Sequence, residues 1–258
     1  MARDDASRWS DSPAYVWAGS ETRGIERIDA PPLDLMRGID RQKASTLANV
    51  ERHAKGVAAH DMLLWGSRGM GKSALVRSVV ADVQERAIGD IALIQLSAER
   101  IDGLPALFRD LAQIERRFLV YVDDLGFVPG SMEGPRRLRS LLEGGIEARP
   151  DNVRLAVTSN YRAILSREMD AGEQRHARDR ADDELALADR FGLVLGFHAC
   201  SQDDYLAIVA GYAERYGLDW SESDAIEWAA QRGARSGRTA WQYITEIAGR
   251  AGKALANP

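Results

Sequence analysis

Apolar residues gather in five short, nearly continuous runs, and longer segments of helical periodicity separate these runs along the chain. The runs have the length of strands that are buried on both faces of a sheet, and they cover residues 62–65, 91–96, 118–122, 153–158 and 193–197. The intervening periodicity predicts helices over residues 40–55, 72–86, 104–114 and 136–146. Strands that alternate with helices indicate an α/β fold, in which a five-stranded parallel sheet lies between two layers of helices.

The two ends of the chain depart from this alternation. Three further helical segments follow the last apolar run without strands between them, and we expect a small helical lid from residues 202–216, 223–232 and 239–255. The first 35 residues are polar and punctuated by Trp9, Trp17, Pro31 and Pro32, which predicts an arm that packs on the domain or on a neighbour. The predicted organisation is an N-terminal arm (1–35), an α/β domain (36–200) and a lid (201–258).

The turn after the first run is rich in glycine and ends in Lys72-Ser73. Residues 66–73 fit the pattern G-x-x-x-x-G-K-[ST], between a predicted strand and a predicted helix. Glycines let the backbone N–H groups curl around phosphates, and the N-terminus of the helix attracts the same anion. The alternative is a glycine-rich turn with an incidental lysine. The sequence predicts an ATP site formed by Gly66, Ser67, Arg68, Gly69, Met70, Gly71, Lys72, Ser73 and Ala74.

Two carboxylates end the third apolar run, about fifty residues after this loop. A nucleotide-bound Mg²⁺ needs a carboxylate near the phosphates, and the Ser73 hydroxyl is expected as a second ligand. We therefore expect Asp123 to contact Mg²⁺, and Asp124 to orient or deprotonate the attacking water. The plainer alternative is that both aspartates only cap a strand at the surface.

With these two motifs in place, the chain resembles the AAA+ superfamily, and more closely the bacterial AAA+ family DUF815. The resemblance covers about residues 30–250 and is carried by GIDRQK (38–43), LLWGSRGMGKSALV (63–76), VYVDDLGF (120–127), LRSLLEGGIEARPDNVRLAVTSN (138–160), LADRFGLVLGF (187–197), DDYLAIV (203–209) and ARSGRTAWQY (234–243). It implies a P-loop NTPase fold of the AAA+ type and an Mg²⁺-dependent ATPase. The chain departs from the family at Met70, where threonine is more common, and from AAA+ enzymes at Asp124, where glutamate is usual. Aspartate is shorter by one methylene, so hydrolysis is expected to be slow or completed by a partner, with Glu143 a less favoured base.

The resemblance also implies roles for two polar residues outside these motifs. Asn160, at the end of the fourth run, stands where AAA+ proteins sense the γ-phosphate and position water. Arg190, within Ala188-Asp189-Arg190-Phe191, matches the box that carries an arginine finger directed at the γ-phosphate of a neighbouring subunit. The alternatives are a strand-end asparagine and a surface arginine paired with Asp189. An arginine finger implies a homo-oligomer, in this superfamily most often a ring of six.

Two further positions complete the resemblance. Arg238, at the start of the last lid helix, looks like the second sensor of AAA+ proteins, and Arg235 competes for the role. Gly38 and Ile39 resemble the segment that packs against adenine, although a plain helix-entry turn would have the same sequence.

Composition limits the partner without identifying it. The net charge of −5 disfavours non-specific nucleic-acid binding, although Arg232, Arg235, Arg238, Arg250 and Lys253 gather near the C-terminus. Residues 97–105 lack the aromatic residue that unfoldases of the superfamily use to grip clients. Three functions stay open: a remodelling or loading ATPase acting on a protein partner, a helicase-loader-like or DNA-associated ATPase, and a slow ATP-dependent assembly switch.

The remaining sequence signals predict a cytoplasmic protein. Cys200 is the only cysteine, so no disulfide can form within the chain. The longest apolar runs are too short to cross a bilayer, and residues 1–12 lack the apolar core of a signal peptide. The four histidines show no metal-ligand spacing, so the only cofactors that we predict are ATP and Mg²⁺.

Overall fold

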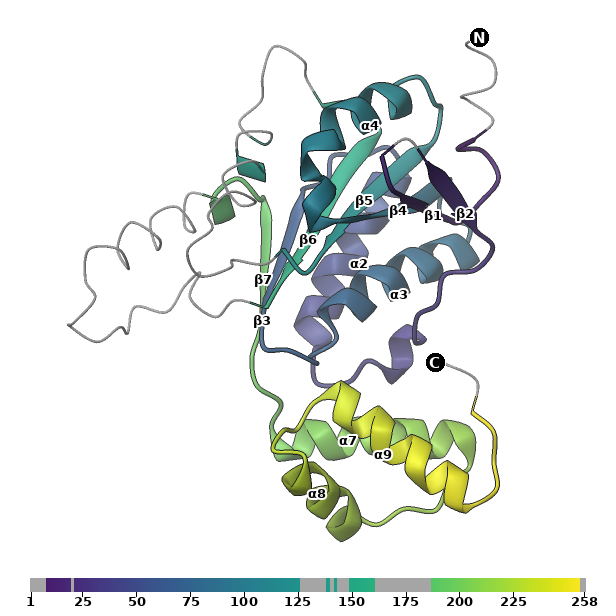
Figure 1. Cartoon of the computed structure of the whole chain (residues 1–258), viewed down its shortest axis with the longest axis vertical. Helices are drawn as coiled ribbons and strands as arrows, with labels where there is room; N and C mark the ends of the chain where they lie inside the picture. Colours follow the sequence, from purple (N-terminus) through teal and green to yellow (C-terminus); the bar gives the residue numbers. More distant parts are fainter. Residues whose placement is uncertain are drawn as a thin grey trace, which may run out of the picture.

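A seven-stranded sheet runs through the centre of the computed structural model, which describes residues 8–19, 21–125, 138–139, 142, 149–160 and 187–255. The five predicted strands are β3 to β7, all parallel to one another: β3 (Met62–Gly66), β4 (Ile91–Ser97), β5 (Arg117–Asp123), β6 (Val153–Ser159) and β7 (Leu193–Phe197). The order across the sheet is β2-β1-β4-β5-β6-β3-β7. The structure therefore confirms an α/β fold that is built on a mostly parallel sheet (Figure 1).

The number of strands was predicted wrongly, because the segment before residue 35 contributes two more. Strand β1 (Ala14–Trp17) pairs parallel with β4, and β2 (Thr22–Ile25) pairs antiparallel with β1. Strand β2 contains a glycine and an arginine and produces no apolar run, whereas the four apolar residues of β1 stand within the mostly polar segment that we assigned to an arm. Trp9 holds this segment against the sheet through edge contacts with the rings of Tyr15 and Phe118.

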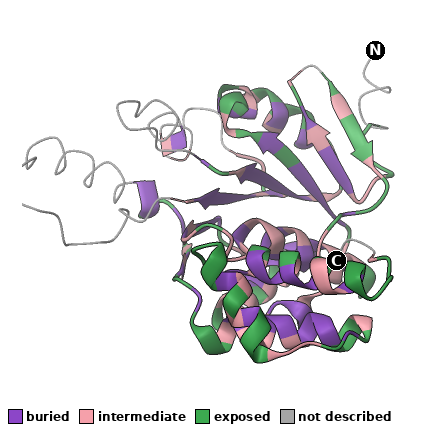
Figure 2. Cartoon of the chain, turned by 60° about the horizontal axis from the view of Figure 1, so that its bottom comes forward, coloured by how far each residue is buried: buried purple, intermediate pink, exposed green. Residues whose placement is uncertain are grey.

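Alternation of side chains along each strand divides the core into two layers. On β5, Leu119 and Tyr121 point into the layer under α2 (Asp40–Ala54) and α3 (Lys72–Glu85). Phe118, Val120 and Val122 point into the other layer, which α4 (Leu104–Leu111) and the short helix η2 (Ala98–Gly103) cover. A second short helix, η1 (Leu33–Leu35), precedes α2. Figure 2 shows the central strands as a buried layer between these helices. Most of the helix predicted at 136–146 lies outside the described residues.

The last three helices form a bundle with its own core, as predicted: α7 (Gln202–Tyr216), α8 (Glu222–Gln231) and α9 (Gly237–Arg250). Each begins at a serine whose hydroxyl accepts a hydrogen bond from the backbone N–H three residues later, and these serines are Ser201, Ser221 and Ser236. Met70 of the glycine-rich loop packs against the core of this bundle. The lid therefore lies against the loop (Figure 1).

Within the described residues, no helix combines the length and the hydropathy needed to cross a lipid bilayer.

A buried histidine, His53, is expected to make the fold sensitive to acid. Nε2 of His53, on α2, lies 3.0 Å from the carbonyl oxygen of Phe118, and burial lowers the pKa of His53 to about 4. Since an unfolded histidine has the higher pKa, the unfolded chain binds the extra proton between about pH 6.5 and pH 4, and stability falls as the pH is lowered through that window. The imidazole alone is expected to cost about 3 kcal/mol of unfolding free energy by pH 4.

Urea unfolding tests this expectation. The free energy of unfolding is measured at pH 7 and pH 4, and its change between the two pH values is compared among variants. His53→Gln keeps a donor for the Phe118 carbonyl and does not titrate, so its free energy should depend less on pH than that of the parent. His198→Gln, at an exposed position, should retain the parent dependence. Equal pH dependence in both variants would assign the acid sensitivity to other groups.

Candidate active site

The glycine-rich loop joins β3 to α3 and has a backbone that only glycine tolerates at three places. Gly66, Gly69 and Gly71 have φ values of +123°, +74° and +84°. A Cβ on Gly66 would lie 2.1 Å from the carbonyl oxygen of Phe197, on the neighbouring strand. Gly71 caps the N-terminus of α3, so the loop presents the start of that helix to the space beside it.

Lys72 is buried at the start of α3, and its ammonium group points back across the loop. It donates hydrogen bonds to the carbonyl oxygens of Gly66 at 2.9 Å and Ser67 at 2.8 Å, and to Oδ1 of Asn160 at 2.9 Å. Burial lowers the pKa of Lys72 to about 8, while the charges of Asp124 and Asp123 oppose that shift. The ammonium therefore carries its positive charge at neutral pH.

Asp123 lies at the carboxyl end of β5 and meets three hydroxyl groups. Its Oδ1 accepts hydrogen bonds from Ser73 Oγ at 2.8 Å, from Thr158 Oγ1 at 2.9 Å and from the hydroxyl of Tyr121. Burial and the hydrogen bond to Asp123 raise the pKa of Tyr121, so its hydroxyl stays protonated at neutral pH. A carboxylate and a hydroxyl in contact are the hard oxygen ligands that Mg²⁺ prefers, so Asp123 and Ser73 fit this ion.

Asp124 follows in a left-handed conformation, with φ +48°. Its backbone N–H donates to Thr158 Oγ1 at 2.9 Å, and its Oδ1 accepts a hydrogen bond from Asn160 Nδ2 at 2.5 Å. Asn160 therefore bridges Asp124 to Lys72, and the positively charged and negatively charged parts of the site form one hydrogen-bonded chain.

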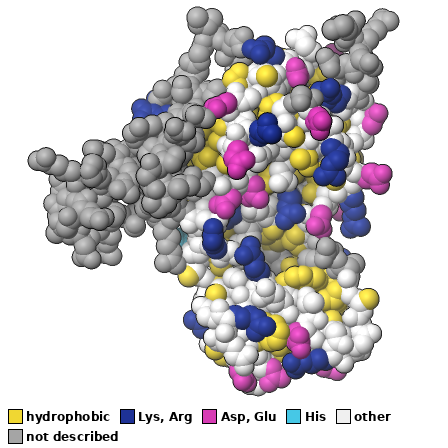
Figure 3. Space-filling view, in the orientation of Figure 1, with side chains coloured by type: hydrophobic (Ala, Val, Ile, Leu, Met, Phe, Trp, Pro, Cys, Tyr) yellow, Lys and Arg dark blue, Asp and Glu magenta, His cyan; other side chains and the backbone are white. Residues whose placement is uncertain are grey.

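A cavity of about 650 Å³ opens above this chain, between the loop and the lid. Its polar part includes Lys72, Ser73, Asp123, Asp124 and Asn160, and its apolar part consists of Pro31, Leu35, Met36, Ile39, Met70, Ile208, Tyr212 and Trp241. Figure 3 shows hydrophobic and basic side chains together where the lid meets the α/β layers. A charged end and an apolar end in a cavity of this volume suit a nucleotide, with its phosphates at one end and its base at the other.

Most of the residues that the sequence singled out line this cavity. They are Ile39, Arg68, Gly69, Met70, Gly71, Lys72, Ser73, Ala74, Asp123, Asp124, Asn160 and Arg238. Gly66 and Ser67 lie behind the lining and contact Lys72 through their carbonyl groups. Gly38 is not part of the lining, and its α-carbon faces Asp204 of the lid instead.

The structure separates the two arginines that competed for the second-sensor position. Arg238 lines the cavity, and a Cβ on Gly69 would lie 3.7 Å from its Cβ. Arg235 instead donates a hydrogen bond to Oε1 of Gln202 at 3.4 Å, on the lid itself. Geometry therefore favours Arg238.

Arg190 is exposed and does not line the cavity of its own chain. It precedes β7, and the opposite end of that strand meets the loop, where Phe197 pairs with Gly66. The strand itself, Leu193–Phe197, has a length of roughly 13 Å, and Arg190 lies in the turn that precedes it. Glu143, the alternative base, lies outside the described residues.

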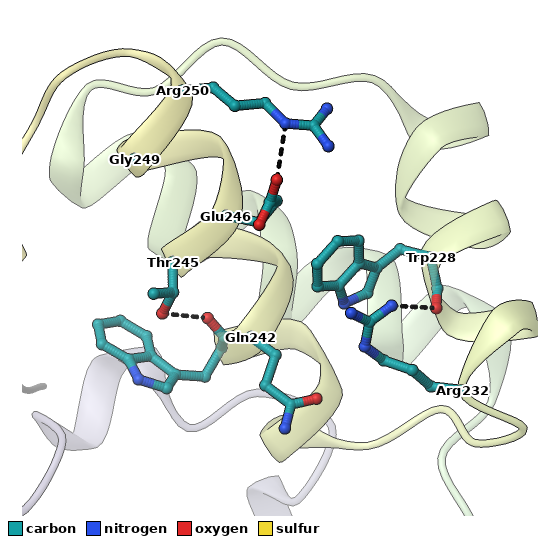
Figure 4. A pocket seen from close by; sticks show the side chains of 8 residues that line it. Trp228, Arg232, Gln242, Thr245, Glu246, Gly249 and Arg250 are labelled. Carbon is teal, nitrogen blue, oxygen red and sulfur yellow. Dashed lines mark hydrogen bonds and ion pairs between the residues drawn. The ribbon is translucent and has the colours of Figure 1, made fainter.

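The basic side chains near the C-terminus do not form one patch. Arg232 stacks on the ring of Trp228, with 3.3 Å between Cζ and the ring centroid, beside a hollow on the outer face of the lid (Figure 4). Arg250 pairs with Glu246 at 2.8 Å, and Lys253 donates to the carbonyl of Gly217. Arg235 contacts Gln202 and Arg238 lines the cavity, so these five charges lie in different surroundings.

Sequence reasoning missed Tyr121 and Thr158, the two hydroxyls that hold the aspartates, and the lid aromatics Tyr212 and Trp241. Tyr121 had one available signal, since it lies two residues before Asp123 and therefore on the same face of the strand. Thr158 had no such signal, because a β-branched residue is common in any strand.

Comparisons with known proteins place this geometry in a family. Residues 10–251 match the family described as "Protein of unknown function (DUF815)". No curated protein sequence matches the chain. Among solved structures, the A156S mutant of RuvB from Thermotoga maritima has a TM-score of 0.56 at 17% identity, covering 88% of this chain and 68% of that one.

Two further structures extend the likeness. T. maritima RuvB, titled a Holliday junction branch migration motor, has a TM-score of 0.54 at 17% identity and covers 88% of this chain and 68% of that one. The ORC1 protein of Aeropyrum pernix, solved in complex with DNA, has a TM-score of 0.60 at 16% identity and covers 87% and 66%. At such identities the likeness establishes the fold, and RuvB and ORC1 are AAA+ ATPases. The chain belongs to the DUF815 family and has the fold of the AAA+ P-loop ATPases.

Proposed function

We propose that this protein binds ATP with Mg²⁺ and hydrolyses it, and that its nucleotide state controls self-assembly and the remodelling of a macromolecular partner. The observation that carries the proposal is the hydrogen-bonded chain from Lys72 through Asn160 to Asp124, which ends beside the Ser73–Asp123 pair on one cavity. A structural role for these polar groups would not require them to gather at a cavity beneath a lid.

The binding roles follow from position. The loop N–H groups and Lys72 hold the β- and γ-phosphates, and the apolar part of the cavity takes the adenine between Ile39 and the lid. Ser73 and Asp123 would hold Mg²⁺, and the ion would neutralise part of the charge of the phosphates. Arg238 brings a positive charge from the lid to the same phosphates, so nucleotide binding would draw the lid towards the loop.

The chemical roles fall to the residues around Asp124. Its carboxylate orients the attacking water and accepts a proton from it, and the Asn160 amide aligns the same water with the γ-phosphate. Aspartate has a shorter reach than the glutamate usual in AAA+ enzymes, which supports slow turnover. Arg190 completes the site of a neighbouring copy, since it lies at the other end of its own sheet.

Asp124→Asn tests the chemical step. This variant should retain ATP but hydrolyse it about 10²-fold more slowly or worse, because the amide cannot accept a proton. Phosphate release and binding of a fluorescent ATP analogue, measured on the same preparation, separate these two effects. Asp110→Asn, at an exposed position on α4, is the matched control and should keep the parent rate. Hydrolysis at the parent rate in Asp124→Asn would exclude Asp124 as the base.

A DNA-associated ATPase is the second candidate. It is favoured by the titles of the similar structures, one a branch migration motor and one a complex with DNA. The net charge of −5 and the dispersal of the lid arginines support a protein partner instead. Recovery of partners on the ATP-trapped Asp124→Asn variant, with and without nuclease, distinguishes them, because a DNA-mediated complex would be lost on digestion.

A further inference from the structure

Tyr121 is the unexpected member of the site, since it brings a hydroxyl into an otherwise apolar strand. The side chains of β5 from Phe118 to Val122 are buried, and Tyr121 itself is 1% exposed. Its ring packs in the core layer under α2 and α3, where a phenylalanine would fill the same space. Burying a hydroxyl costs free energy unless it finds a hydrogen-bond partner, and here that partner is Asp123.

The three hydroxyls on Asp123 all meet the same oxygen. Oδ1 accepts from Tyr121, Thr158 and Ser73, which come from β5, β6 and α3, whereas no described residue donates a hydrogen bond to Oδ2. The carboxylate is therefore held in one orientation, with one oxygen occupied by the protein and the other left available.

Ser73 differs from the other two donors because it is also the expected ligand of Mg²⁺. A hydroxyl has one donor proton and two lone pairs, so Ser73 could ligate the ion and still donate to Asp123, but its position would then depend on the ion. Tyr121 and Thr158 have no expected role as ligands, so they orient the carboxylate whether or not the ion is bound. Groups that orient a metal ligand in this way raise metal affinity by lowering the cost of ordering it.

We propose that Tyr121, together with Thr158, is a positioning residue that prepares Asp123 for Mg²⁺, an inference that rests on the proposed function. Thr158 Oγ1 also accepts a hydrogen bond from the backbone N–H of Asp124, so one threonine contacts both aspartates. Tyr121 acts on Asp123 alone. The two hydroxyls therefore differ in a measurable way: loss of Tyr121 should affect the metal, and loss of Thr158 should affect the metal and turnover.

The test measures binding of a fluorescent ATP analogue while Mg²⁺ is titrated, with a parallel measurement in EDTA. Tyr121→Phe should raise the Mg²⁺ concentration at the midpoint about 10-fold, the lower end of the effect of removing such a partner, and should leave the EDTA affinity at the parent value. Thr158→Val should raise it similarly, and Thr158→Ser, which keeps the hydroxyl, should restore it. Tyr15→Phe removes a buried tyrosine hydroxyl from β1 and is the matched control, with the parent midpoint.

The outcomes separate the inference from the proposed function. A parent midpoint in Tyr121→Phe, or an equal loss of affinity with and without Mg²⁺, would overturn the positioning role while leaving ATP binding intact. A parent protein that binds no ATP analogue would contradict the proposed function itself. If Tyr121→Phe does not fold, as judged by circular dichroism, the Thr158→Val and Thr158→Ser pair decides the question through the same Mg²⁺ titration.

Discussion

Replacing Lys72 with alanine is expected to abolish ATP binding while the protein stays folded. The ammonium is the one lysine charge at the base of the cavity, and hydrogen bonds to charged groups contribute about 1.5–3 kcal/mol each. Losing two such bonds to the phosphates corresponds to a loss of affinity of about 10²–10⁴-fold. Titration with a fluorescent ATP analogue measures this loss, and circular dichroism checks the fold.

Lys55→Ala provides the control for this substitution. Lys55 is exposed at the end of α2, on the side of the domain where Gly56 approaches Arg117, so its removal should leave ATP affinity unchanged. Unaltered affinity in Lys72→Ala would show that the loop does not bind the phosphates, and the proposed function would then have no support.

Arg190→Ala is expected to retain ATP and lose hydrolysis by about 10³-fold or more, the effect of removing an arginine finger. The reason is that Arg190 precedes the amino end of β7 and does not line its own cavity, so we expect it to act on a neighbouring copy. A contact of this head-to-tail kind forms a ring if the rotation closes and a filament if it does not. ATP turnover per subunit in the parent protein should accordingly rise with protein concentration. Light scattering in the presence of ATP should detect assembly over the same range of concentrations.

Mixing two inactive variants makes the same prediction sharper. Arg190→Ala subunits keep an intact Asp124, and Asp124→Asn subunits keep an intact Arg190, so one type of boundary in a mixed assembly has both. Activity should reappear on mixing, while each variant alone stays inactive. Concentration-independent turnover, no assembly in any nucleotide and no rescue would together leave Arg190 as a surface arginine.

The parts of the site that the sequence predicted are those encoded over a few adjacent residues. The glycines around Lys72 can be identified from the sequence, because positive φ values and the start of a helix require a short glycine-rich motif. Asp123 can be identified because it directly follows a long apolar run. Strands β3 to β7 were predicted for the same reason.

The site residues that were missed depend on how strands that are distant in the sequence pair with one another. Tyr121 pairs with Ala156 and Val122 with Val157, and only this register brings Thr158 beside Asp123. Nothing within either strand records that pairing. Strands β1 and β2 were missed because their stability comes from pairing at the edge of β4. Gly38 and Ile39 were both assigned to the adenine site on resemblance, but of these two residues only Ile39 lines the cavity.

The hairpin of β1 and β2 also has a consequence for solubility. Without it, the backbone groups of β4 from Leu93 to Gln95 would be unpaired at the edge of the sheet, in a strand that is mostly apolar and could template strand-to-strand aggregation. The hairpin pairs with this stretch and ends the sheet with a short strand that carries Arg23 and Gly24, which are poor partners for a further strand. A chain trimmed to begin at residue 36 would lose this cover, so strands β1 and β2 are expected to protect the protein against misassembly.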